Sequence, residues 1–191
     1  MPIPEKIEDV YTYADYMERD EGERAEIING DLCMMSTPST LHQQISAALM
    51  FQLMSYLNGK KCQAIAAPFA VRLFERHDDK PENVYTVVEP DISVICNADK
   101  LDEKGCKGAP DMVIEILSPS SARHDKLTKF NLYQRAGVPE YWIVDPVYKT
   151  VQVFLLEDGK YTRSEDYFAE DRIKVHALKD CIIELDKIFR E

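Results

Sequence analysis

Hydrophobic residues recur at helical spacing in three segments of the chain, and we expect a helix in each. The first predicted helix runs from about residue 7 to residue 20, and the second covers residues 40–57 with Gly59 as its terminator. The third covers about residues 122–136 and ends at Gly137. One face of the second helix is expected to carry Leu41, Ile45, Ala48, Leu49, Leu53 and Tyr56.

Short β-prone runs separated by turn residues fill most of the remaining chain. In residues 24–35, Asn29-Gly30 stands between two such runs, which is typical of a hairpin with a type I′ turn. Residues 97–109 are charged and contain glycine, so we expect a loop there. Further strands are predicted in residues 62–74 (two strands, broken at Pro68), 86–96, 112–117, 140–145, 150–156, 161–168 and within the tail 172–189.

This order of elements predicts an α/β (α+β) protein with a central mixed β-sheet flanked by helices. A length of 191 residues with 45% hydrophobic content suffices for one sizeable core, so we expect a single domain over residues 1–191. No stretch approaches the roughly 18 apolar residues of a membrane span, and the N-terminus is acidic where a signal peptide would be basic. We therefore expect a cytoplasmic protein that does not enter a membrane.

The cysteines and the charge narrow the picture further. Five cysteines without CxxC spacing argue against a complete disulfide framework, so we expect buried reduced thiols, except for Cys106 in the polar loop. A formal net charge of −11 argues against indiscriminate nucleic-acid binding, which depends on neutralising phosphates with Lys and Arg. A local basic surface remains possible beside Asp125, because four basic residues follow one another there: Arg123, Lys126, Lys129 and Arg135.

Two acids occupy strands that otherwise demand burial. Alternation places Asp91 on the more polar face of its strand, and Glu115 is the single charge in the run MVIEIL. A buried lone carboxylate is costly unless it is paired or metal-bound, so Glu115 is either a structural ion-pair partner or a site residue. On the third helix, Lys126, Lys129 and Tyr133 project along a common side, which is either a solvated face or the cationic part of the same site.

Several motifs together resemble a known family. They are EIINGDL, the following helix with His42, VEPDISVI, GAPDMVIEILSPSS, the D-x3-K spacing of Asp125 and Lys129, and GVPEYWIVDP. The chain resembles the PD-(D/E)XK nuclease superfamily and, more closely, the Uma-two family of restriction-endonuclease-like proteins. The resemblance extends along nearly the whole chain.

The resemblance implies a set of site residues. It makes Asp91 and Glu115 the metal ligands and excludes Asp111, which lies on the same strand as Glu115. The superfamily lysine would stand at residue 117, which is leucine here, so Lys129 is expected to take its place, with Lys126 as the competitor. Possible accessory residues are His42, Glu26 and Tyr133, although a single helical histidine would by its position alone indicate no function.

The implied activity is metal-dependent cleavage of phosphodiester bonds. Oxygen ligands suit Mg²⁺, with Mn²⁺ as a substitute, and the expected partner is DNA. A homodimer is expected because two sites are needed to cut both strands. The alternative is a catalytically inactive nuclease-like fold that serves as a nucleic-acid-binding or assembly module, which Leu117 and the acidic surface favour. The sequence contains no GxSxG motif, which argues against a Ser or Cys hydrolase.

Overall fold

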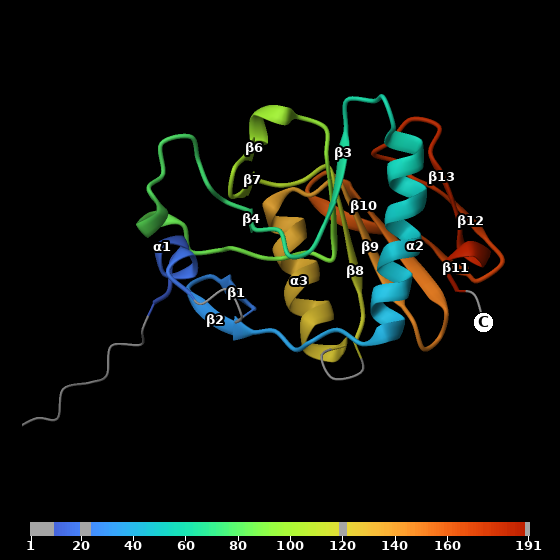
Figure 1. Ribbon diagram of the computed structural model, residues 1–191, viewed down its shortest axis with the longest axis horizontal. Coiled ribbons are helices and arrows are strands. Elements are labelled where there is room, and N and C mark those ends of the chain that lie inside the picture. Colours follow the sequence, from blue (N-terminus) through green and yellow to red (C-terminus); the bar gives the residue numbers. More distant parts are fainter. Residues whose placement is uncertain (1–9, 20–23, 119–121, 190–191) are drawn as a thin grey trace, which may run out of the picture.

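The computed structural model describes residues 10–19, 24–118 and 122–189, without the side chains of residues 122–126, 163 and 164. Its centre is a six-stranded sheet in the order β11-β10-β9-β8-β5-β3 (Figure 1). Only β8 and β9 run parallel, and the other neighbours are antiparallel, so the predicted mixed sheet is confirmed. The strands are β3 (Gln63–Ala66), β5 (Ile92–Ile95), β8 (Met112–Ile116), β9 (Glu140–Asp145), β10 (Thr150–Glu157) and β11 (Lys160–Phe168).

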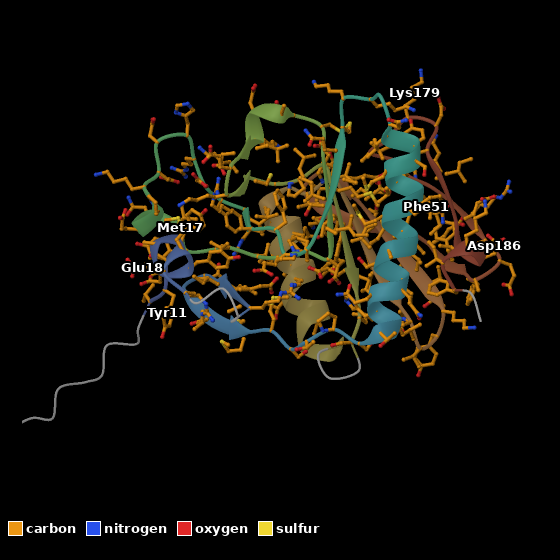
Figure 2. The ribbon with its side chains drawn as sticks, viewed as in Figure 1. Tyr11, Met17, Glu18, Phe51, Lys179 and Asp186 are labelled. Atoms are coloured by element: carbon orange, nitrogen blue, oxygen red, sulfur yellow. A yellow bond between two sulfur atoms is a disulfide. The ribbon has the colours of Figure 1, made fainter. Side chains whose placement is uncertain are left out.

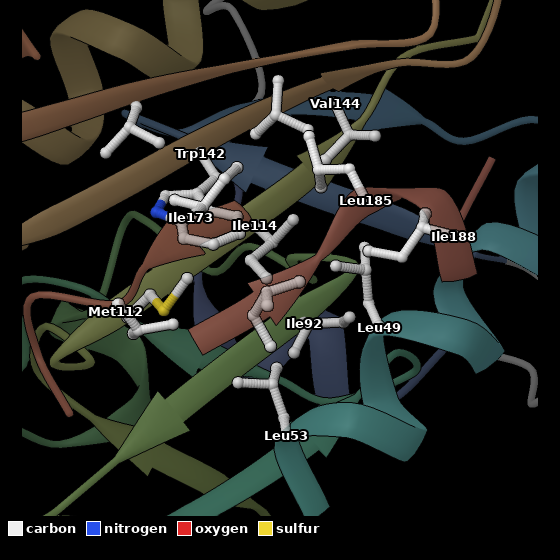
Figure 3. Packing of buried hydrophobic residues seen from close by; sticks show 14 of the residues in the cluster. Leu49, Leu53, Ile92, Met112, Ile114, Trp142, Val144, Ile173, Leu185 and Ile188 are labelled. Atoms are coloured by element: carbon white, nitrogen blue, oxygen red, sulfur yellow. The ribbon is translucent and has the colours of Figure 1, made fainter. Parts of the chain in front are cut away.

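Helix α2 (Thr40–Leu57) covers one face of this sheet together with the C-terminal segment. Ile45, Leu49 and Leu53 of the helix pack against strand residues that include the fully buried Trp142 (Figure 3). On the outer side of the helix, Phe51 points away from the sheet and is exposed (Figure 2). The C-terminal segment comprises β12 (Arg172–Lys174), β13 (Ile182–Glu184) and the 3-10 turn η3 (Leu185–Lys187).

Helix α3 (Ala122–Ala136) covers the opposite face and connects the parallel strands β8 and β9 (Figure 1). A parallel pair needs such a crossover, which is why the helix stands between these two strands in the sequence. Aromatic rings fill the space beneath it, with Tyr133 and Tyr141 5.0 Å apart between ring centroids. The predicted third helix and the strand after it are therefore confirmed.

The N-terminal hairpin joins the α3 side of the molecule. Strands β1 (Ala25–Ile28) and β2 (Asp31–Met34) are linked by Asn29 and Gly30, both with positive φ (52° and 91°), as the type I′ prediction requires. Hydrogen bonds in both directions between Ile27 and Val87 attach the hairpin to the rest of the chain.

Three predicted elements differ from the structure: the first helix, the strand over residues 86–96 and the loop over residues 97–109. The first helix, α1, spans only Tyr13–Met17 within the described residues, because Thr12 is held by the Asp15 carboxylate and the N–H of Tyr11 bonds to Gly30 instead of continuing a helix. The strand expected over 86–96 is shorter, since a bend at Asp91 separates β5 from the bridges at residues 87 and 88.

The expected loop 97–109 contains secondary structure of its own. It forms the strands β6 (Leu101–Asp102) and β7 (Gly105–Lys107), which join β4 (Val71–Arg72) in a small sheet. The close approach explains the glycine, because a Cβ on Gly105 would lie 2.1 Å from the carbonyl oxygen of Ala70. Two short 3-10 turns, η1 (Pro81–Asn83) and η2 (Ala98–Lys100), complete this region.

The cysteine prediction was wrong at two positions. Cys62 and Cys96 form a disulfide, because they extend the β3–β5 register by one pair beyond Gln63 and Ile95. Spacing along the sequence could not reveal this proximity. Cys106, expected in a polar loop, is fully buried, and burial raises the pKa of its thiol to about 11.

No helix among the described residues is long and apolar enough to span a membrane.

Candidate active site

Strand β8 presents Glu115 to helix α3. Met112, Ile114 and Ile116 pack on the α2 side of the sheet, whereas Val113 packs on the α3 side. Because side chains alternate along a strand, Glu115 shares the α3 face with Val113. The acid that appeared out of place in the sequence thus points into the layer between the sheet and the crossover helix.

Asp91 lies opposite Glu115, immediately before the first residue of β5. The β5–β8 register is antiparallel and pairs Ile92 with Ile114, so its continuation by one residue places Asp91 opposite Glu115. The Oδ2 atom of Asp91 accepts a 2.7 Å hydrogen bond from the backbone N–H of Ile116. The strand that carries one carboxylate therefore fixes the other.

His42 approaches Asp91 from the first turn of α2. Ser39 caps this helix by accepting a hydrogen bond from the backbone N–H of His42, which sets where the imidazole emerges. The Nε2 atom lies 3.1 Å from Oδ2 of Asp91, and this hydrogen bond raises the pKa of His42. Nδ1 is buried and has no partner among the described residues. The structure thus brings His42 into the site.

Helix α3 supplies a lysine and a tyrosine to Glu115. The Lys129 ammonium and the Tyr133 hydroxyl both donate to Oε1 of Glu115, at 2.9 and 2.6 Å. Lys129 also donates to Oε1 of Glu26, at 2.8 Å. With 8% of its surface exposed, Lys129 is no part of a solvated face. It bridges two carboxylates from different elements.

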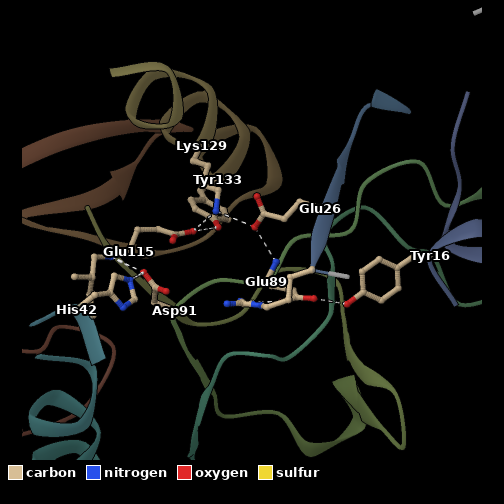
Figure 4. Close-up of polar contacts among 10 residues, drawn as sticks. Tyr16, Glu26, His42, Glu89, Asp91, Glu115, Lys129 and Tyr133 are labelled. Atoms are coloured by element: carbon tan, nitrogen blue, oxygen red, sulfur yellow. Dashed lines mark hydrogen bonds and ion pairs between the residues drawn. The ribbon is translucent and has the colours of Figure 1, made fainter. Parts of the chain in front are cut away.

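A second layer of polar contacts continues from Glu26 (Figure 4). Its Oε1 atom also accepts the backbone N–H of Glu89, at 2.9 Å. The carboxylate of Glu89 accepts hydrogen bonds from the Tyr16 hydroxyl and the Arg24 guanidinium. A continuous chain of contacts therefore leads from helix α1 to the Lys129 ammonium.

Negative charge exceeds positive charge at this centre. Burial raises the pKa of Glu115 to about 7, the Lys129 ammonium opposes that rise, and the carboxylates of Asp91 and Glu26 add to it. Burial alone would lower the pKa of Lys129, but Glu115 and Glu26 together raise it, so the lysine is protonated. The carboxylates thus outnumber the ammonium, and a further cation would be stabilised here.

These side chains open into a pocket of about 330 Å³. Its wall also contains Arg24 and Tyr141, which the sequence did not single out. Tyr141 is almost fully buried, and its hydroxyl makes no hydrogen bond within the described part of the chain. In the parallel register Tyr141 pairs with Val113, two residues before Glu115 on β8, but no sequence signal distinguishes it from the aromatic core residues.

The other predicted residues have different positions. Asp111 accepts the backbone N–H of Cys96 and does not line the pocket, as expected. Leu117 lines the pocket where the superfamily lysine would stand. The side chain of Lys126 lies outside the described part of the chain. The expected basic surface does not include Lys129, because that side chain is buried.

The donor set fits a hard divalent cation. Oδ1 of Asp91 and Oε2 of Glu115 accept no hydrogen bond from the described residues, and both side chains line the pocket. No group of three His, Cys, Asp or Glu side chains suited to a metal ion occurs among the residues that the structure describes. Two carboxylates nevertheless suffice for Mg²⁺, which keeps several of its waters.

Two carboxylates and a lysine beside a mixed sheet with a crossover helix define a restriction-endonuclease-like α/β protein. The chain belongs to the Uma2 family, whose description is "Putative restriction endonuclease", and matches it over residues 8–185. The predicted family is thereby confirmed.

Individual relatives support the fold and the family. A crystal structure of a "putative nuclease belonging to DUF820" from Anabaena variabilis superposes with a TM-score of 0.73 over 94% of this chain and 97% of that one. At 19% sequence identity, this likeness concerns the fold alone. Two uncharacterised proteins from Synechocystis sp. are similar as well. One is 26% identical over 169 residues (87% of this chain, 83% of the relative), the other 23% over 141 residues (71% and 75%).

Proposed function

We propose that this protein is a metal-dependent endonuclease that hydrolyses phosphodiester bonds of DNA. The observation that carries the proposal is the convergence of Asp91, Glu115 and the buried Lys129 on one pocket. Asp91 and Glu115 would hold Mg²⁺ or Mn²⁺ through their outward oxygens. When bound, such an ion neutralises charge at a phosphate and activates water.

The protein's own groups set the geometry of this site. Lys129 uses two of its three N–H groups on Glu26 and Glu115, which leaves one to orient a water or a phosphate oxygen. Tyr133 fixes the Glu115 rotamer, and the N–H of Ile116 fixes Asp91. His42 restricts Asp91 from the other side and is in a position to hold a proton beside it. We infer a preorganised centre in which little movement precedes reaction.

The second candidate is a nuclease-like module without catalysis. It is favoured by Leu117, which occupies the usual lysine position, and by the commitment of Lys129 to two carboxylates. In that case the pocket would bind a divalent ion or nucleic acid without turnover. Cleavage assays separate the two candidates. A module without catalysis would bind a divalent ion or nucleic acid but would form no cleavage product.

The test uses a matched pair of aspartates. Asp91 and Asp111 each accept one backbone N–H at 2.7 Å, but only Asp91 lines the pocket. With plasmid and single-stranded DNA in Mg²⁺ or Mn²⁺, Asp91→Asn and Glu115→Gln should each lower cleavage by at least about 100-fold. Asp111→Asn should stay within about twofold of wild type. Cleavage that persists in both site variants would refute the proposal.

We also propose that the enzyme acts as a homodimer, since cutting both strands of a duplex takes two sites. Light scattering during gel filtration measures the mass of the species in solution. A monomer that linearises plasmid in one binding event would contradict this part of the proposal.

A further inference from the structure

The pocket needs a cation that faces nucleic acid. Three carboxylates from Glu26, Asp91 and Glu115 line it, and they repel phosphates. Lys129 is nearly buried and is engaged with Glu26 and Glu115. Arg24 is the other lysine or arginine that lines the pocket among the described residues.

The contacts of Arg24 leave most of its donors available. Its Nε and Nη2 atoms both donate to the same oxygen, Oε2 of Glu89, at 3.1 and 2.9 Å. A guanidinium has five N–H groups, so three remain, and Nη1 bonds to none of the described residues. The side chain is 31% exposed. Because the Tyr16 hydroxyl occupies Oε1 of Glu89, Arg24 meets a single oxygen of that carboxylate, and its side chain lines the pocket.

Glu89 holds this arginine in place. Its side chain is 5% exposed, and its other oxygen, Oε1, accepts the Tyr16 hydroxyl at 2.6 Å. Both oxygens are therefore occupied, which makes Glu89 an anchor for Arg24 and not a ligand for a metal. The backbone N–H of Glu89 bonds to Glu26, so the anchor is attached to the same contacts that position Lys129.

We propose that Arg24 binds a backbone phosphate of the nucleic acid next to the scissile phosphate, which would lie at the metal ion that Asp91 and Glu115 would hold. This inference rests on the proposed function and deepens it, because the substrate must then span at least two phosphates. Arginine suits this role, since its planar fork donates two parallel hydrogen bonds to phosphate oxygens and keeps its charge at any working pH. The contact would offset the repulsion between the acidic pocket and the strand.

The experiment measures binding without cleavage. A fluorescein-labelled 12-nucleotide DNA strand and the corresponding duplex are titrated in EDTA and in Ca²⁺, by fluorescence anisotropy, over a series of salt concentrations. Arg24→Gln should weaken binding at least about tenfold. It should also lower the slope of log affinity against log salt by about 0.7 for the strand and about 0.9 for the duplex.

A matched control separates a local contact from a change in net charge. Arg172 lies on β12, is 71% exposed and pairs with Glu184 of β13, and it does not line the pocket, so Arg172→Gln should leave both affinity and slope within error. Arg24→Lys keeps the charge and loses the fork, so it should weaken binding severalfold with the salt slope unchanged. This variant also carries the test if Arg24→Gln fails to fold, as circular dichroism would show.

The outcomes distinguish this inference from the proposed function. Wild-type affinity and slope in Arg24→Gln, or an equal loss in Arg172→Gln, would overturn the Arg24 proposal even if the protein cleaves DNA. Absence of binding by wild type would overturn it as well. The expected loss of binding in Arg24→Gln, without cleavage by wild type in Mg²⁺ or Mn²⁺, would support Arg24 and refute the nuclease.

Discussion

Replacing Glu115 by glutamine should make the metal-free protein more stable at alkaline pH. Burial and the neighbouring carboxylates raise the pKa of Glu115 from its ordinary value of 4.5 to about 7. At about 1.4 kcal/mol per pKa unit, the ionised form costs the folded state about 3 kcal/mol. Glutamine does not ionise, and its Oε1 can still accept the bonds from Lys129 and Tyr133.

The sign follows from proton binding. The folded protein holds the Glu115 proton more tightly than the unfolded chain, so its contribution to stability is complete below pH 4.5 and is lost as pH rises through about 7. Between pH 5.5 and 8.5 the free energy of unfolding of wild type should therefore fall, relative to Glu115→Gln, by about 2 kcal/mol. Urea unfolding at both pH values measures this difference.

A control and a ligand complete the test. Glu157 is exposed in the β10–β11 hairpin, so Glu157→Gln makes the same charge change and should show no such pH-dependent gap. Mg²⁺ at ten times its dissociation constant should stabilise wild type at pH 8.5 by about 1.4 kcal/mol and Glu115→Gln by much less. If Glu115→Gln loses stability relative to wild type as the pH rises, the carboxylates of the site do not destabilise the ionised form of Glu115, and the reasoning is refuted.

Three further predictions concern two other residues of the pocket and the disulfide. Lys129→Met leaves two buried carboxylates without their cation and should lower the free energy of unfolding at pH 8 by about 3–5 kcal/mol in urea titrations, and by less at pH 5. Tyr141→Phe removes a hydroxyl that has no hydrogen-bond partner among the described residues, so stability should change by less than about 0.5 kcal/mol while cleavage or DNA binding weakens. A loss of stability large enough to account for the weaker cleavage or binding would contradict this. Serine at both Cys62 and Cys96 opens a loop of sequence separation 34 and should lower the free energy of unfolding by about 2–4 kcal/mol, with thiol titration of wild type confirming the bond.

The sequence was most informative where local periodicity decides the structure. The long helices, the Asn29-Gly30 hairpin and most strands follow from spacing within a few residues, and the structure confirms them. The singular charge of Glu115 in an apolar strand also follows from local alternation. The superfamily resemblance placed Asp91 and Glu115 on neighbouring strands, and the 23 residues between them leave room for the chain to return.

The rest of the site depends on contacts that no local pattern encodes. Arg24 and Tyr16 reach Glu89 across 65 and 73 positions of sequence, and neither residue is unusual in its own segment. The pairing of Cys62 with Cys96 depends on a strand register that the sequence leaves open. The prediction that His42 and Glu26 lie near Asp91 and Glu115 came from the family resemblance, and not from the positions of the two residues in a helix or a strand.

A lysine that reaches Glu115 from a helix depends on more of the fold for its position than a lysine on the same strand would. A lysine at residue 117 would be placed by the same strand as Glu115, whereas Lys129 reaches Glu115 from α3 and is held from the other side by Glu26. Glu26 belongs to the N-terminal hairpin, which backbone bonds to Val87 attach to the chain. The hairpin is therefore a wall of the site, and its loss would leave Lys129 with one carboxylate and the pocket without Arg24. The segment EIINGDL therefore belongs to the site in space, although it lies far from Asp91 and Glu115 in sequence.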